Sequence, residues 1–214
     1  MKKFLASIFT SLLTLLFVTS VFAQTNLTGK VIVLDPGHGG SDTGAVNGTL
    51  YEKTVTSDVA NRLKTLLEAD GATVYLTRDC DCDKSNNDRY TLANSVGGNI
   101  LVSIHLNGST NSTKDGTQGL WGKKNKDQAF TKTVHQALAG SLGVPDLGIT
   151  NFASGVLLKS NMPATIAETV FITNTNEYSL LTDGTGNRHQ QIAQSLYLGI
   201  IKWFANPPTS TRHP

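Results

Sequence analysis

Short apolar runs alternate with amphipathic segments along most of this chain, and this alternation restricts the fold more than any other feature. Val31–Leu34, Thr73–Thr77 and Ile100–His105 are short runs rich in β-branched and aliphatic residues, which predicts strands. Residues 52–68 instead place apolar side chains at helical spacing, and Asp70-Gly71 ends that helix. Strands that alternate with helices predict an α/β domain whose sheet is covered on both faces.

The rest of the chain continues this alternation. Helices are expected over residues 88–96, 127–142 and 189–204, and short strands over 156–158 and 164–167. The stretch from Gly108 to Gly119 is rich in Gly, Ser, Thr and Asn and is expected to be a loop. The elements together predict one domain over residues 24–206, with a mostly parallel twisted sheet of about six strands flanked by helices on both faces, of the phosphorylase/hydrolase-like kind.

The N-terminus has the layout of a secretory signal peptide. Lys2 and Lys3 precede the uncharged apolar stretch 4–18, and Val21-Phe22-Ala23 offers small or aliphatic residues to a signal peptidase. The apolar stretch is shorter than the roughly 20 residues of a membrane-spanning helix, so no stable membrane anchor is expected. We therefore expect residues 1–23 to be removed and the mature chain, starting at Gln24, to be secreted to the periplasm or the exterior.

Charge and composition restrict the possible partners. The chain carries 18 basic and 16 acidic side chains, and loss of the two N-terminal lysines would balance them. A nucleic-acid-binding protein normally has a basic excess, so no nucleic-acid partner is expected. No repeat, second module or long linker is visible, and we expect a monomer. Residues 207–214 are rich in proline and cannot continue a helix, which predicts a disordered tail.

The two cysteines, Cys80 and Cys82, lie within an acidic stretch. Their spacing is too close for the usual cysteine pair of a metal site. In an exported protein they are expected either to close a small disulfide ring or to pair between chains. Residues 79–83 resemble the start of a calcium loop, but Lys84 replaces its glycine and Tyr90 its closing glutamate. This stretch is therefore interpreted as an acidic surface loop.

Side chains suited to metal binding follow three expected strands and open one helix. His38 follows the first strand, His105 ends the third, Glu168 follows the strand 164–167, and Glu52 opens the first long helix. Active sites of α/β sheets gather beyond the carboxyl ends of the strands. Two histidines, one carboxylate and an open position form a catalytic zinc site, and a second carboxylate can act as general base. Each residue also has an ordinary structural explanation, and spacing alone leaves both interpretations open.

Further motifs stand around these residues in a fixed order. They are Val31–Gly40, Glu52-Lys53, Thr77-Arg78, Arg89 with Ala93-Asn94, Val102–Asn107, and Met162-Pro163-Ala164 leading to Glu168. In this order they resemble the zinc-dependent N-acetylmuramoyl-L-alanine amidases of the third amidase family. The resemblance spans almost the whole expected mature chain.

The resemblance implies a function for each candidate residue. His38, Glu52 and His105 are expected to bind one Zn²⁺ per chain, and Glu168 to be the catalytic glutamate. The implied reaction is hydrolysis of the amide bond between the lactyl group of N-acetylmuramic acid and the L-alanine of the stem peptide in peptidoglycan. Asn107, two residues beyond a ligand, is expected either to contact this substrate or to brace its own loop.

The chain departs from the family at two positions, and two other functions stay open. Val170 stands where glycine is frequent and Lys159 where arginine is common, and both are expected to alter the substrate groove. The segment between His105 and Glu168 is too compact for an inserted blocking helix, so activity without an activator is expected. The alternatives are a zinc carboxypeptidase or endopeptidase acting on wall peptides, and a catalytically inactive wall-binding module.

Overall fold

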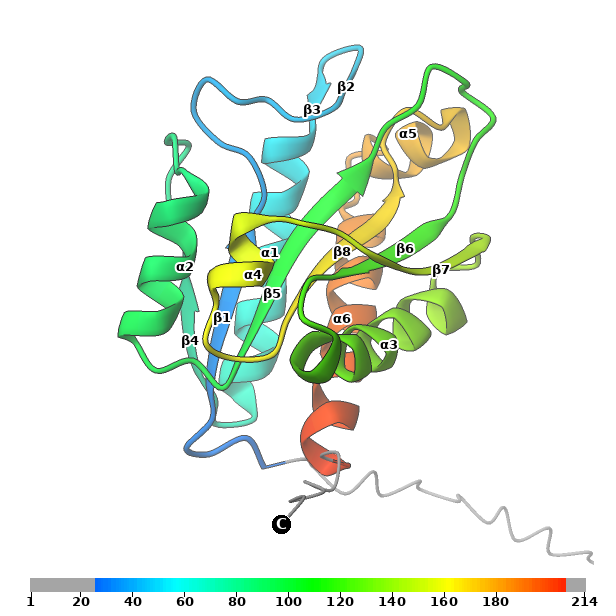
Figure 1. The fold of residues 1–214 in the computed structure, drawn as a ribbon. Helices are drawn as coiled ribbons and strands as arrows, with labels where there is room; N and C mark the ends of the chain where they lie inside the picture. Colours follow the sequence, from blue (N-terminus) through cyan, green and yellow to red (C-terminus); the bar gives the residue numbers. More distant parts are fainter. Residues whose placement is uncertain (1–25, 207–214) are drawn as a thin grey trace, which may run out of the picture.

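The computed structural model describes residues 26–206, which form one α/β domain (Figure 1). The expected signal peptide and the expected tail lie outside these residues. In chain order, the elements are β1 (Val31–Pro36), β2 (Val46–Asn47), β3 (Leu50–Tyr51), α1 (Glu52–Ala69), β4 (Thr73–Leu76), α2 (Asn86–Ser95), β5 (Ile100–Asn107), β6 (Thr117–Trp121), α3 (Lys124–Ser141), β7 (Asp146–Asn151), α4 (Gly155–Lys159), β8 (Ala164–Phe171), α5 (Thr175–Leu181) and α6 (Asn187–Ala205).

Six strands form the central sheet in the order β4-β1-β5-β8-β6-β7. The pairs β4–β1, β1–β5, β5–β8 and β6–β7 are parallel, whereas β6 runs antiparallel to β8. The predicted mostly parallel sheet of about six strands is therefore confirmed. Because β1, β5 and β8 are parallel neighbours, their carboxyl ends lie side by side at one edge of the sheet.

Helices cover both faces of the sheet, as predicted (Figure 1). On one face, α6 packs against both α1 and α3, and all three helices contribute to the larger apolar core. On the other face, α2 and α4 cover a smaller core that includes Ala93, Val156 and Leu157. The spacing of Val55, Val59, Leu63 and Leu67 along α1, all fully buried, explains why this helix forms against the sheet.

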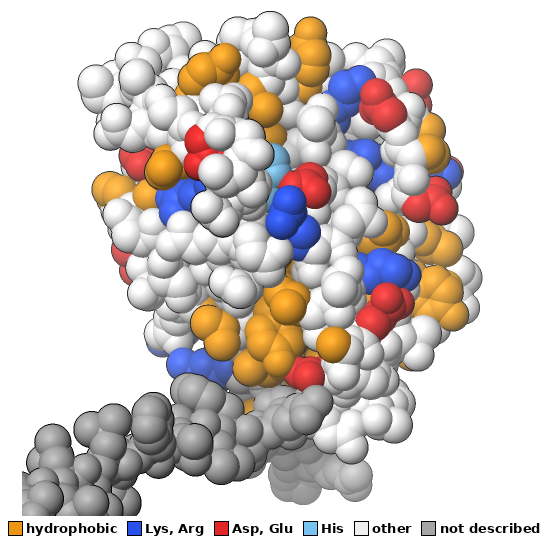
Figure 2. All heavy atoms as spheres, turned by 180° about the vertical axis from the view of Figure 1, so that it is seen from behind, with side chains coloured by type: hydrophobic (Ala, Val, Ile, Leu, Met, Phe, Trp, Pro, Cys, Tyr) orange, Lys and Arg blue, Asp and Glu red, His pale blue; other side chains and the backbone are white. Residues whose placement is uncertain are grey.

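Figure 2 shows the molecule from the side of α1 and α6. Basic and acidic side chains are interspersed there rather than segregated, in accord with the near balance of charges in the sequence. Within residues 26–206, no helix combines the length and the apolar character needed to cross a membrane.

Several predictions of secondary structure were wrong. Residues 156–158, predicted as a strand, lie in α4, because a short apolar run fits a buried helix turn as well as a strand. The expected loop 108–119 ends early, since Thr117 already begins β6. The strands β6 and β7, the helix α5 and the short hairpin β2–β3 were not predicted. They carry few buried apolar residues, so they lack the hydrophobic pattern on which the prediction rested.

Candidate active site

Side-chain alternation along neighbouring strands directs His105 and Glu168 to one face of the sheet. In β5, Ile104 and Leu106 enter the larger core, so the intervening His105 points to the opposite face. In β8, Ile166 belongs to the smaller core on that opposite face, and Glu168 follows it at the same alternation. His105 and Glu168 are paired directly in register. Both lie within their strands, not at or after the strand ends as predicted, because β5 and β8 extend further than expected.

Glycines allow the candidate ligands to approach one another closely. His38 lies on the loop after β1 with a left-handed backbone, φ 62°. A Cβ on the preceding residue, Gly37, would lie 2.4 Å from the ring of His105. A Cβ on Gly44 would lie 2.6 Å from both the His38 ring and the carboxylate of Glu52. Any side chain at either glycine would therefore separate the three groups.

Glu52 begins α1, and two backbone N–H groups fix its carboxylate. The N–H of Leu106 donates to Oε1 over 2.8 Å, and the N–H of Ala45 donates to Oε2 over 2.8 Å. The side chain is buried. Oε1 is thereby held 3.1 Å from both His38 Nε2 and His105 Nδ1.

Three ligand atoms converge at this point. His38 Nε2, His105 Nδ1 and Glu52 Oε1 form a triangle in which each of the three separations is 3.1 Å. Nitrogen and oxygen ligands of a tetrahedral zinc ion lie about 3.3 Å apart, given zinc–ligand bonds of roughly 2.0–2.1 Å. His38, Glu52 and His105 are also the group identified as able to hold a metal ion within the described residues. The donor set and its spacing therefore fit zinc, with one side of the triangle left for water or substrate.

The close contacts within this cluster shift the pKa values of His38 and Glu52 in opposite directions. Burial lowers the pKa of His38, but hydrogen bonds and charge from Glu52 and Asp42 outweigh it and raise this pKa to about 9. Burial raises the pKa of Glu52, but His105 and His38 lower it further, to about 2. Asp42 Oδ2 lies 2.9 Å from His38 Nδ1, and this contact directs Nε2 toward the other ligands.

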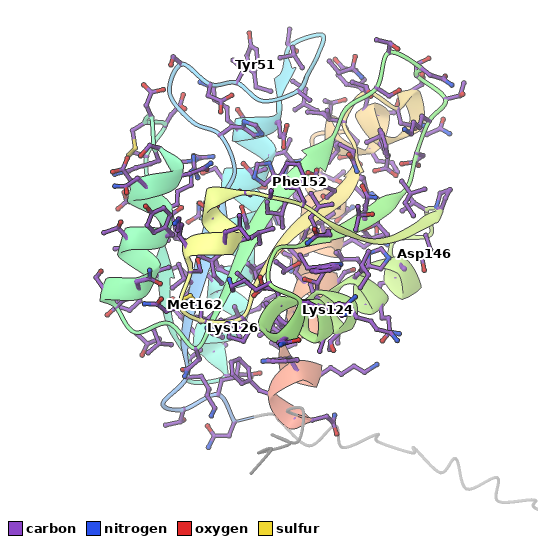
Figure 3. The ribbon with its side chains drawn as sticks, in the orientation of Figure 1. Tyr51, Lys124, Lys126, Asp146, Phe152 and Met162 are labelled. Atoms are coloured by element: carbon purple, nitrogen blue, oxygen red, sulfur yellow. A yellow bond between two sulfur atoms is a disulfide. The ribbon has the colours of Figure 1, made fainter. Side chains whose placement is uncertain are left out.

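Glu168 faces the same cavity without belonging to the triangle. The cavity has a volume of about 410 Å³ and is lined by all three candidate ligands and by Glu168. Burial, and to a smaller extent the charge of Glu52, raises the pKa of Glu168 despite the nearby histidines. Phe152, 49% exposed, also lines the cavity (Figure 3). A carboxyl group with a raised pKa beside a metal cluster is suited to proton transfer.

Asn107 lines this cavity as well, at the end of β5. Its side-chain nitrogen is buried and has no acceptor among the described residues. The two departures from the family pattern do not line the cavity. Val170 is fully buried in the larger core, and Lys159 ends α4. The expected effect of these two residues on the groove is therefore not supported by their positions.

A buried charge network in the wall of the same cavity was not predicted from the sequence. Asp35 Oδ1 accepts hydrogen bonds from Arg89 (2.6 Å) and Thr77 (2.5 Å), and Oδ2 accepts one from Ser103 (2.5 Å). Arg89 also donates to the carbonyl oxygen of His38 over 2.9 Å. A carboxylate at the end of an apolar strand was a usable signal, since a buried charge requires partners.

Comparisons with known proteins agree with this geometry. A family model described as N-acetylmuramoyl-L-alanine amidase matches residues 32–202. The chain is 32% identical to the amidase LytC of Bacillus subtilis, covering 83% of this chain but 36% of LytC. It is 33% identical to the germination-specific N-acetylmuramoyl-L-alanine amidase of the same organism, covering 85% of this chain and 84% of the relative.

Solved structures show the same fold. The catalytic domain of the amidase CwlV from Bacillus (Paenibacillus) polymyxa superposes with a TM-score of 0.77 at 31% identity, covering 82% of this chain and 98% of that domain. An N-acetylmuramoyl-L-alanine amidase from Clostridium difficile gives the same TM-score at 30% identity, covering 83% and 98%. The site geometry, the family match and these relatives lead to one conclusion: the chain belongs to the N-acetylmuramoyl-L-alanine amidase family.

Proposed function

We propose that this chain is a zinc-dependent amidase that separates the L-alanine of the stem peptide from the lactyl group of N-acetylmuramic acid. The observation that carries this proposal is the convergence of three ligand atoms beside Glu168, within a chain of this family. His38, Glu52 and His105 would hold the ion. When bound at such a site, zinc acidifies water and polarises a carbonyl group.

The residues of the chain account for the proton transfers. Glu168 accepts a proton from the attacking water and delivers it to the amide nitrogen that leaves with L-alanine. Its raised pKa suits both steps, because a general acid–base group works best when its pKa approaches the working pH. Glu52 cannot replace it, since its pKa is about 2 and both of its oxygens accept backbone N–H groups.

The reaction products are expected to identify the bond that is cut. Purified mature protein with zinc should release peptides that begin with L-alanine and leave peptide-free glycan strands. Mass spectrometry of digested peptidoglycan measures both. We expect this activity without any added protein, because the cavity is lined by all four candidate residues. The zinc-free protein is the control.

Other products would support other functions. Peptides shortened at the carboxyl end or cut internally would indicate a wall peptidase, and binding without cleavage an inactive module. The presence of His38, Glu52, His105 and Glu168 in one cavity favours an active enzyme over such a module. A requirement for an added activator would contradict the expected independence. A structure is known of the CwlD amidase from Clostridioides difficile in complex with the GerS lipoprotein.

Asn107 is proposed as a substrate contact. Its buried amide nitrogen lacks an acceptor among the described residues and lies in the cavity wall, so it is available to a substrate oxygen. Asn107→Ala is expected to lower kcat/KM by about tenfold, the value of one hydrogen bond. Zinc content and thermal stability should stay unchanged. A loss of stability with normal kcat/KM in the folded fraction would instead assign Asn107 to bracing its loop.

We further propose that residues 1–23 direct export and that the mature enzyme starts at Gln24. The support is the charge and apolar pattern of the N-terminus. A substrate in the cell wall also requires an exported enzyme.

A further inference from the structure

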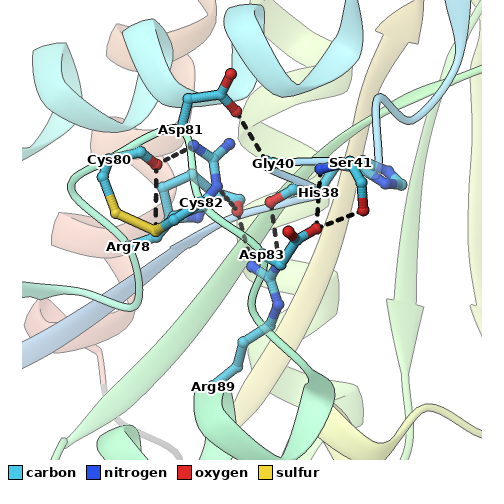
Figure 4. Close-up of a disulfide and its surroundings, with 10 residues drawn as sticks. His38, Gly40, Ser41, Arg78, Cys80, Asp81, Cys82, Asp83 and Arg89 are labelled. Carbon is cyan, nitrogen blue, oxygen red and sulfur yellow. Dashed lines mark hydrogen bonds between the residues drawn. A yellow bond between two sulfur atoms is a disulfide. The ribbon is translucent and has the colours of Figure 1, made fainter.

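The acidic stretch around the two cysteines is not a free surface loop. Cys80 and Cys82 form a disulfide, which closes a small ring between β4 and α2. Figure 4 shows that this ring lies against the loop that carries His38. From the sequence alone the pairing of the two cysteines stayed open, and the stretch was expected to be a surface loop with no role in the site.

Two aspartates of the ring segment hold the backbone that follows His38. Asp83 Oδ1 accepts hydrogen bonds from the Ser41 N–H (2.9 Å) and the Ser41 hydroxyl (2.7 Å). Asp81 Oδ1 accepts one from the Gly40 N–H (2.8 Å). These bonds connect side chains and backbone about 40 residues apart in the sequence, at positions two and three residues after the ligand.

The other side of the ring is anchored to the interior. Arg78 donates from Nη1 to the carbonyl oxygen of Cys80 (3.2 Å) and from Nη2 to that of Gly37 (3.0 Å), directly before His38. The carbonyl oxygen of Cys82 lies against Gly39, where a Cβ would approach it to 2.5 Å. The ring segment, residues 80–83, therefore contacts the backbone after the ligand directly and the backbone before it through Arg78.

His38 needs such support because of its own backbone. Its φ of 62° lies in the left-handed region, which a residue with a Cβ adopts only where the surroundings impose it. The two aspartates are exposed, and an exposed hydrogen bond fixes a loop only weakly against the entropy of ordering it. A disulfide inside the segment restricts its conformations before the hydrogen bonds form, and so lowers the entropic cost of ordering the loop.

We propose that Asp81 and Asp83 are positioning residues for His38, and that the Cys80–Cys82 disulfide preorganises the segment that bears them. The ring thus increases the affinity of the site for zinc without contacting the ion. This inference rests on the proposed zinc site. The inference concerns metal affinity, so it is tested by zinc binding and not by amidase activity.

Zinc affinity, measured by competition with a chromophoric chelator, tests the inference on the mature protein. Asp83→Ala and the double variant Cys80→Ser/Cys82→Ser are each expected to weaken zinc binding by about 10- to 100-fold, as for other residues that orient a metal ligand. Asp83→Asn keeps an acceptor oxygen for Ser41 and should bind zinc nearly as tightly as the unaltered protein. The visible spectrum of the cobalt-loaded protein should change in the two weakened variants.

A matched control is available elsewhere in the chain. Asp183 Oδ1 accepts from the N–H (2.8 Å) and the hydroxyl (2.7 Å) of Thr185, the same pattern as Asp83 with Ser41. Asp183→Ala should leave zinc affinity and the cobalt spectrum unchanged. Unaltered zinc affinity in Asp83→Ala and in the double serine variant, with only a lower unfolding temperature of the metal-free protein, would overturn the inference. If the unaltered protein binds no zinc, the proposed function itself fails.

Discussion

Glu52→Ala and Glu168→Ala are both expected to abolish practical amidase activity, but for different reasons. Glu52 Oε1 lies 3.1 Å from each ligand nitrogen and is the anionic member of the triangle. Its removal should release zinc. Glu168 lies opposite His105 in the sheet and outside the triangle, so Glu168→Ala should retain zinc. Its turnover should fall by ~10²–10⁴-fold, the usual contribution of a general acid–base group.

Metal content and turnover, measured on the same preparations, separate the two roles. Glu168→Gln should behave like Glu168→Ala, because an amide cannot accept the proton. Glu68→Ala is a suitable control, since this residue lies at the other end of α1 and pairs with Lys64. Zinc lost from Glu168→Ala but retained in Glu52→Ala would show that the two roles are reversed.

Asp35→Asn is expected to cause the largest loss of stability. Asp35 is 1% exposed and Arg89 6%, and their ion pair measures 2.6 Å. Neutralising Asp35 leaves the guanidinium of Arg89 buried without its counter-charge, which costs about 3–5 kcal/mol of unfolding free energy. Urea unfolding of the metal-free protein at neutral pH measures the difference. Asp183→Asn, in an exposed turn, should differ little from the unaltered protein.

This loss should depend on pH in a defined direction. Burial raises the pKa of Asp35, but the charge of Arg89 and hydrogen bonds from Ser103 and Thr77 outweigh it and hold the pKa below its usual 3.8. Because its pKa is lower in the folded state, the ionised Asp35 carboxylate stabilises the fold at pH values above 3.8. This stabilisation is lost as the pH falls through the folded-state pKa. The stability gap between the unaltered protein and Asp35→Asn should therefore narrow at strongly acidic pH. A gap independent of pH would contradict the assigned charge effect.

The sequence determined the elements that bury continuous apolar faces. The strands around Val33 and Val102 and the helix containing Val59 were predicted because their hydrophobic period matches their secondary structure. The motif order along the chain, which carries the family resemblance, also predicted His38, Glu52, His105 and Glu168 as candidate site residues, and the structure brings them to one cavity. The strand β7 and the helix α5 were not predicted, because their hydrophobic patterns are weak.

Only the tertiary structure decided how distant segments meet. Local pattern could not distinguish the helix turn at Val156 from a strand, because burial against β8 and α2 settles that choice. It could not reveal that β6 reverses direction against β8. The ligand triangle and the contact of the Cys80–Cys82 ring with the His38 loop likewise join residues far apart in the chain. The side-chain pattern of a segment indicates which of its residues are buried. Which other segment it packs against depends on the packing of the whole domain.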